Sequence, residues 1–215
     1  EVQEFRRTFS LGLRAIFLIT IPAGVGLIAL REPVIQLFFQ QGKFGASDTT
    51  ATAWALLFYC LGLFTYSALQ LLNRVFYSLK DTITPVVVGI ASIAFNILFS
   101  IILVRYMQAN GLALAYSLAG AVNMLVLMVL LRRRIGSIDG GRILKTFAIA
   151  CAASGLMYAA ARFTALSLSA GLTLAPKISE LITVLAGMGV GVLVYGAIVL
   201  FFTGLDRHYR LERHP

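Results

Sequence analysis

Residues 50–104 read TATAWALLFYCLGLFTYSALQLLNRVFYSLKDTITPVVVGIASIAFNILFSIILV, and this stretch decides the fold class. Two long apolar runs flank a short polar segment, residues 73–85, which holds charged side chains and several hydroxyls. A membrane-spanning helix needs about 20 mostly apolar residues, and each run has that length. The stretch therefore predicts two transmembrane helices joined by a tight polar turn.

The composition extends this prediction to the whole chain. Of the 215 residues, 59% are hydrophobic and 13% charged, with a mean hydropathy of +0.88. Soluble domains carry about 25% charged residues, and one soluble core of this size could not bury so much apolar surface. Runs such as MLVLMVLL do not alternate as barrel strands do, so helices are expected to satisfy the backbone. We predict an all-α, polytopic membrane helical bundle with six spans, at about 10–30, 49–73, 84–104, 111–131, 144–165 and 179–203.

Lysine and arginine predict the orientation of the bundle, because loops on the cytoplasmic side carry an excess of both. With a cytoplasmic N-terminus, 13 of the 18 basic residues are inside and 5 outside. The inner set is Arg6, Arg7, Arg14, Arg74, Lys80, Arg132, Arg133, Arg134, Arg142, Lys145, Arg207, Arg210 and Arg213; the outer set is Arg31, Lys43, Arg105, Arg162 and Lys177. Both ends are then cytoplasmic. The net charge of +9 reflects this topology and attraction to anionic inner-leaflet lipid, and requires no nucleic acid partner.

The polar segment 73–85 reads as an inner turn with a structural role. Asp81 or Thr82 can cap the following helix, and Pro85 suits its first turn. Arg74 lies near the inner end of the preceding span, where it can reach the headgroups. Since most polar turn residues act locally, we favour a capped, solvated turn over a substrate contact. A second short segment, 31–44, reads as an outer interfacial helix ended by Gly42.

Few polar residues lie deep in the predicted spans. Asn96, Ser100, Ser117 and Asn123 are the ones at depth, and none is a carboxylate. Asn96 and Ser100 share one helix face, since they are four residues apart. We favour interhelical hydrogen bonds for these groups, with a small hard cation as the alternative.

Two further features concern the first and last spans. Pro22 removes a backbone hydrogen bond and is expected to kink the first span. Gly187, Gly189 and Gly191 in the last span allow either tight helix packing or an open lipid groove, and both readings stay open. Motifs of hydrolases, metalloproteases and nucleotide-binding loops are absent, so we predict no enzyme. Transporter, channel or scaffold subunit remain.

Three stretches of the chain resemble the MurJ (MviN) lipid II flippases, of the multidrug/oligosaccharidyl-lipid/polysaccharide exporter superfamily. They are LREPVIQLFFQQGKFGASDT (30–49), YCLGLFTYSALQLLNRVFYSLKDTITPV (59–86) and GLALAYSLAGAVNMLVLMVLLRRR (111–134). The resemblance covers about residues 5–134 well, and 135–215 in layout only. Because such proteins have fourteen helices and this chain begins at Glu1, we expect a C-terminal fragment. It would carry the last four helices of the second six-helix lobe (1–134) and the C-terminal pair with a basic cytoplasmic tail (135–215).

The resemblance also implies a function and candidate sites. The family moves undecaprenyl-linked peptidoglycan precursor across the bacterial cytoplasmic (inner) membrane by alternating access. Its partners would be that lipid, other membrane lipids and the missing N-terminal helices. Asn96 matches an Asn of the family's sodium site, while Ser100 and Ser117 fall near its other positions. No cofactor beyond possible sodium is implied, and the last two spans, with Gly187 and Gly191, would form an apolar groove for the lipid tail. An exporter of another polyprenyl-linked glycan or of a drug, and a non-transporting membrane scaffold, are the alternatives.

Overall fold

The computed structural model describes residues 2–136, 139–171 and 176–211, and in these ranges the regular structure is helical throughout. Six helices are long and apolar enough to cross a membrane, as the sequence predicted. The seventh is the short helix expected in segment 31–44, and it ends before Gly42, which has a positive φ of 63°. The seven helices are α1 (Val2–Ala29), α2 (Arg31–Phe39), α3 (Ala46–Ser78), α4 (Ile83–Met107), α5 (Ala109–Ile135), α6 (Gly140–Gly171) and α7 (Pro176–Leu211).

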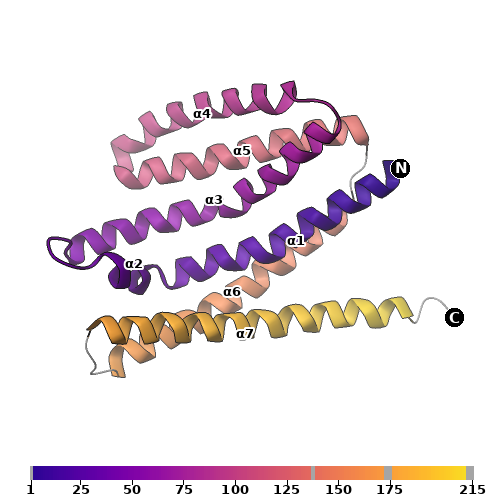
Figure 1. The fold of residues 1–215 in the computed structure, drawn as a ribbon. Helices are drawn as coiled ribbons and strands as arrows, with labels where there is room; N and C mark the ends of the chain where they lie inside the picture. Colours follow the sequence, from indigo (N-terminus) through magenta and orange to yellow (C-terminus); the bar gives the residue numbers. More distant parts are fainter. Residues whose placement is uncertain (1, 137–138, 172–175, 212–215) are drawn as a thin grey trace.

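Helix α1 is central to the bundle. It packs against α3 on one side and α6 on the other, while α5 joins α3 to α4 and α7 covers α6 (Figure 1). The main core lies where α1, α3, α5 and α6 meet, around Leu13, Leu72, Phe76 and Leu131, all with exposed fractions of 0%. Phe17 of α1 meets Phe64 of α3 and Phe147 of α6 edge-on, so aromatic contacts tie the two sides of the bundle together.

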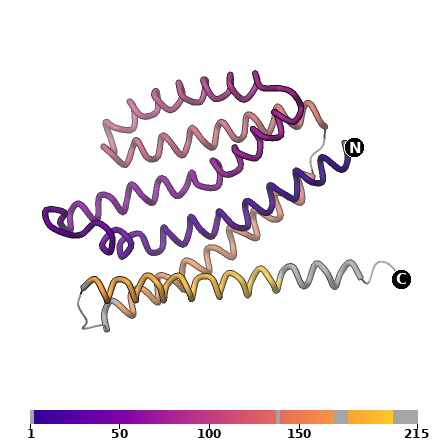
Figure 2. Tube along the Cα trace, viewed as in Figure 1, coloured from indigo at the N-terminus to yellow at the C-terminus, as the bar shows by residue number. Residues whose placement is uncertain are grey.

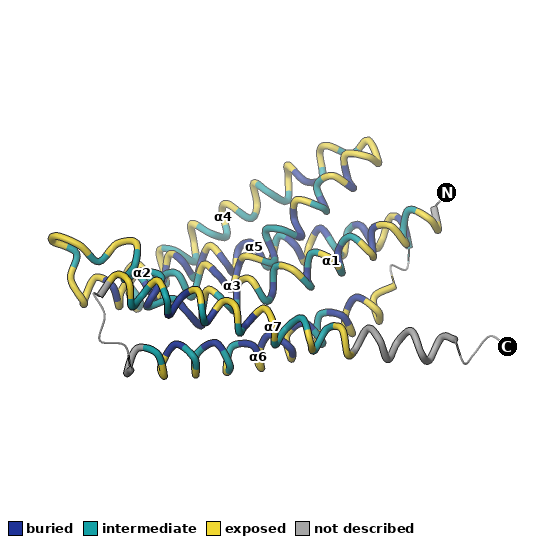
Figure 3. Tube along the Cα trace, turned by 60° about the horizontal axis from the view of Figure 1, so that its bottom comes forward, coloured by how far each residue is buried: buried dark blue, intermediate teal, exposed yellow. Residues whose placement is uncertain are grey.

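Helix α4 is the least covered of the six long helices. Pro85 is its one residue buried in the described structure, and it packs mainly on α5. Figure 3 shows α4 exposed or half-buried along nearly its whole length. In a membrane protein such a face meets lipid or other helices, so α4 lies at an edge of this bundle.

The chain passes back and forth between two ends of the bundle. Figures 1 and 2 place the N-terminus, the α3–α4 turn and the start of α6 at one end, with α2 and the α4–α5 turn at the other. The predicted inner basic residues Arg6, Arg74, Lys80, Arg134 and Arg142 therefore share one end. The C-terminal members of that set lie outside the side chains that the structure describes.

Candidate functional site

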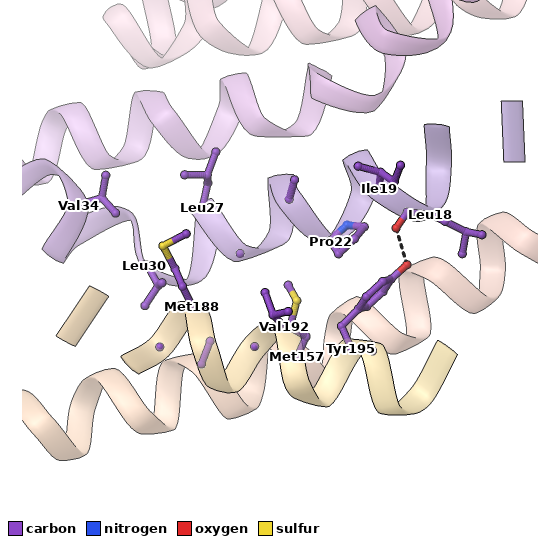
Figure 4. A pocket seen from close by; sticks show the side chains of 16 residues that line it. Leu18, Ile19, Pro22, Leu27, Leu30, Val34, Met157, Met188, Val192 and Tyr195 are labelled. Carbon is purple, nitrogen blue, oxygen red and sulfur yellow. Dashed lines mark hydrogen bonds between the residues drawn. The ribbon is translucent and has the colours of Figure 1, made fainter. Parts of the chain in front are cut away.

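An apolar groove lies between α1, α2, α6 and α7, with a cavity volume of about 500 Å³. The close-up in Figure 4 shows its side chains converging from α1 on one wall and α7 on the other. Tyr195 carries the one side-chain hydroxyl of the lining. The lining residues are Leu18, Ile19, Pro22, Ala23, Gly26, Leu27, Leu30, Val34, Met157, Ala161, Gly187, Met188, Gly191, Val192, Tyr195 and Gly196.

Two glycines of α7, Gly187 and Gly191, line this groove and lie close to side chains of its other walls. A Cβ added at Gly187 would lie 2.7 Å from Leu30 Cδ2, and one at Gly191 would lie 3.3 Å from Met157 Cγ. By contrast, a Cβ at Gly189 would meet no atom within 4 Å, so this glycine faces away from the neighbouring helices. The structure thus places Gly187 and Gly191, but not Gly189, along an apolar cavity.

The opposite wall of the groove comes from α1, which the sequence analysis did not include. The sequence assigned the groove to the last two spans, but α6 contributes Met157 and Ala161 while much of the lining belongs to α1. The signal for this wall in the sequence was the pair Pro22 and Gly26. These residues are four apart and therefore share one face of the helix, and neither has a long side chain. Sequence periodicity alone does not say which helix lies opposite α7.

A hydrogen bond crosses the groove at the Leu18 end. The Tyr195 hydroxyl donates to the backbone carbonyl oxygen of Leu18 at 2.7 Å. Leu18 is four residues before Pro22, and proline has no N–H to donate to that carbonyl. Figure 4 shows the bond running from α7 to α1 beside the Pro22 ring. Tyr195 was not singled out from the sequence, because only the fold brings it to Leu18.

The predicted sodium ligands make two separate hydrogen bonds. Ser100 Oγ donates to Asn96 Oδ1 at 3.0 Å along α4, whereas Ser117 Oγ of α5 donates to the Phe58 carbonyl of α3 at 2.6 Å. Among the described residues, no cluster of three His, Cys, Asp or Glu could hold a metal. Sodium binding at these three residues stays a prediction. Asn123 Oδ1 is buried without a hydrogen-bond partner in the described structure.

The turn between α3 and α4 holds Asp81 between two partners. Asp81 Oδ1 accepts a hydrogen bond from the Thr84 N–H at 3.0 Å, the geometry of a helix cap, and Oδ2 pairs with Arg134 at the end of α5 at 2.5 Å. Hydrogen bonds from Thr84, and then the Arg134 charge, lower the pKa of Asp81 below its usual value. Pro85 is buried in the first turn of α4, while Arg74 is exposed. Arg134 was missed as the partner because it lies 53 residues away in sequence.

Helix α2 contacts both α3 and α6 at the end of the bundle that lies away from the α3–α4 turn (Figure 1). Glu32 pairs with Arg162 of α6 at 3.4 Å, and the Arg31 guanidinium lies 5.0 Å from the centre of the Trp54 ring of α3. The ion pair and the cation–π contact are both partly exposed, so each contributes about 1 kcal/mol or less to stability. Together they hold α2 across one end of the groove, to which it contributes Val34.

Comparisons with known proteins agree on one family. The family model described as "Lipid II flippase MurJ" matches residues 1–200, which extends well past the region recognised from motifs. The chain is 31% identical over 120 residues to the probable lipid II flippase MurJ of Haemophilus influenzae, and 34% over 123 residues to that of Vibrio cholerae. These alignments cover 56% and 57% of this chain.

A solved structure described as "Lipid II flippase MurJ, inward closed conformation" covers 93% of this chain with a TM-score of 0.76 and 28% identity. The chain spans only part of these proteins: 39% of that structure and 23% of each of the two curated relatives. Because the family model matches nearly all of the chain and a solved member shares its fold, this chain belongs to the MurJ lipid II flippase family, a family of transporters rather than enzymes, as the sequence predicted.

Proposed function

We propose that the full protein moves lipid-linked peptidoglycan precursor from the inner to the outer leaflet of the bacterial cytoplasmic membrane by alternating access. Within it, this chain would supply the last six membrane spans. Membership of the MurJ family supports the transport reaction. The observation that carries this chain's own part is the apolar groove between α1, α6 and α7.

The groove suits the tail of such a substrate. A polyprenyl chain has no hydrogen-bonding groups, so its binding surface must be apolar and must leave no polar group unpaired. The lining of this groove meets both conditions, since its one hydroxyl, on Tyr195, already donates to the Leu18 carbonyl. The headgroup would be held by upstream helices, which are the expected partner of this chain.

The exposed face of α4 supports that partnership. Part of a longer transporter should leave a face where the other helices pack, and α4 is the helix with least burial among those described. In this arrangement residues 1–134 complete the second lobe and residues 135–215 form the C-terminal pair. Both ends of the chain would be cytoplasmic, in keeping with the basic residues at one end of the bundle.

Filling the groove tests the proposal. In the full-length parent protein, Gly191→Leu should block transport while the protein still folds, because Met157 is a flexible side chain that can shift. Gly189→Leu is the matched control, because it adds the same bulk where no atom lies within 4 Å. Complementation of a flippase-depleted strain and thermal stability of the purified protein are the two measurements.

The two measurements separate the groove from simple helix packing. Normal stability with lost complementation in Gly191→Leu alone supports the groove. Reduced stability with an unchanged transport rate per folded molecule would show that Gly191 only packs helices, and would sink the groove assignment.

A further inference from the structure

One backbone carbonyl in α1 is freed by proline and is satisfied by another helix. Helix α1 continues through Pro22, whose ring nitrogen carries no hydrogen for the carbonyl of Leu18. In hydrocarbon such a carbonyl needs another donor, because water is absent. The Tyr195 hydroxyl of α7 supplies it at 2.7 Å.

The position of this bond matters because α7 otherwise rests on other helices. Helix α7 packs mainly on α6 and α2 and touches α1 little, which leaves the groove between α1 and α7. Among the described side chains, the Tyr195–Leu18 bond is the one hydrogen bond that joins α7 to α1. Leu18, Pro22 and Tyr195 all line the groove, so the bond crosses the groove itself (Figure 4).

We propose that Tyr195 is a positioning residue that fixes the width of the groove at its Leu18 end by capping the carbonyl that Pro22 frees. With the bond in place, α7 is held against α1 and this end of the groove is closed. When the bond is broken, α7 can move away from α1 and this end opens to the bilayer. That the groove holds a lipid tail rests on the proposed function; the positioning role does not.

The first test measures the distance between α1 and α7. Spin labels at Ala15 and Ala197, both exposed, report the separation of the helices near the bond in the full-length protein without its native cysteines. Tyr195→Phe removes only the hydroxyl and should shift the distance distribution to longer values and broaden it. Tyr66→Phe is the matched control, because it removes an equivalent bond to the Tyr116 carbonyl between α3 and α5 and should leave the α1–α7 distance unchanged.

The second test asks whether the freed carbonyl is the reason for the bond. Pro22→Ala supplies an N–H that can donate to the Leu18 carbonyl within α1. The shift caused by Tyr195→Phe should therefore be smaller in the Pro22→Ala background than alone, a non-additivity that marks direct coupling. An unchanged distance distribution in Tyr195→Phe, or an equal shift in both backgrounds, would overturn the proposal.

Transport then separates this inference from the proposed function. Tyr195→Phe should lower the lipid transport rate per folded molecule several-fold, while Tyr66→Phe should not. If Gly191→Leu abolishes transport and Tyr195→Phe leaves it unchanged, Tyr195 does not position the groove for transport and the inference fails. If instead Gly191→Leu has no effect on transport, the groove assignment fails, and the distance measurements still decide the positioning role.

Discussion

At the turn between α3 and α4, the Asp81 carboxylate serves two partners, the Thr84 amide and the Arg134 guanidinium. The first bond begins α4, and the second ties this turn to the end of α5. Arg134 also donates to the Thr84 hydroxyl at 3.3 Å and lies 6.0 Å from the centre of the Phe76 ring. A turn that looks locally capped from its sequence is thus also a contact between three helices.

Comparing Asp81→Asn with the parent protein should show how much the charge of Asp81 contributes to stability as the pH falls. The folded pKa of Asp81 is lowered, so the charged form stabilises the fold above the unfolded pKa of about 3.9 and this contribution is lost as pH falls through the folded value. Asparagine keeps an oxygen for the Thr84 amide but does not titrate. The difference in melting temperature between the parent and the variant should be constant above about pH 5 and shrink below about pH 4.

A melting-temperature difference that does not change with pH would contradict the role given to the Asp81 charge. Complementation by the same variant tests the structural reading of the turn. If Asp81→Asn folds normally and yet abolishes transport, the turn takes part in function and is not only structural.

Lys80→Gly should stabilise the same turn. Lys80 has a φ of 59°, its N–H donates to the Tyr77 carbonyl, and the Asp81 N–H donates to the Phe76 carbonyl. This is the Schellman arrangement that usually places glycine at the left-handed position. Because a side chain costs about 1 kcal/mol in that conformation, the free energy of unfolding should rise by up to about 1 kcal/mol.

Arg74→Gly is the control for that change, since it removes the same charge within the helical part of α3. Glycine inside a helix costs about 1 kcal/mol, so stability should fall. Unfolding of both purified variants measures the two changes in the free energy of unfolding, which should be a gain for Lys80→Gly and a loss for Arg74→Gly. A loss in both variants would show that Lys80 is not strained.

At the scale of elements, the bundle is held together where small residues let helices approach. Helices α3 and α5 meet at Gly62, where an added Cβ would lie 2.6 Å from Ser117 Oγ and 3.1 Å from Ser117 Cα. Ser117 is 5% exposed and donates across the same contact to the Phe58 carbonyl. Small residues and hydroxyls of this kind replace the hydrophobic effect as the cause of helix association in lipid.

Gly62→Ala should therefore destabilise the protein by about 1–3 kcal/mol, because Ser117 Cα is backbone and cannot rotate away. Gly189→Ala adds the same methyl group with no atom within 4 Å and should cause no loss. Thermal unfolding of the two variants gives the comparison. Equal stabilities would show that α3 and α5 can separate slightly without cost, and that the close contact is not a constraint.

At the scale of the whole molecule, the loops at the two ends of the bundle should lie on opposite sides of the membrane, which can be tested. The proposed orientation places Lys43 outside and Asp139 in the cytoplasm, and both residues are exposed. A single cysteine at Lys43 should react with a membrane-impermeant maleimide in intact cells. One at Asp139 should react only after permeabilisation. If the cysteine of Asp139→Cys reacted in intact cells, the proposed orientation of the bundle would be wrong.

The sequence by itself determined the number, kind and order of the membrane helices. Length and apolarity suffice for this, because in hydrocarbon nearly all backbone groups of a span bond within their own helix, so a span is largely a local property. The turn at Asp81–Pro85 was also readable, since its capping bond joins Asp81 to Thr84 only three residues away. The short helix α2, which begins at Arg31, was likewise predicted from the sequence of segment 31–44.

Only the tertiary structure decided which helices face each other. The Arg134 partner of Asp81, the α1 wall of the groove and the Tyr195–Leu18 bond all join residues far apart in sequence. Apolar spans look alike on every face, because lipid and protein neighbours demand the same kind of side chain. The sequence therefore identified Gly187, Gly191 and Pro22 as unusual, and the packing of α1, α6 and α7 decided that these residues line one groove.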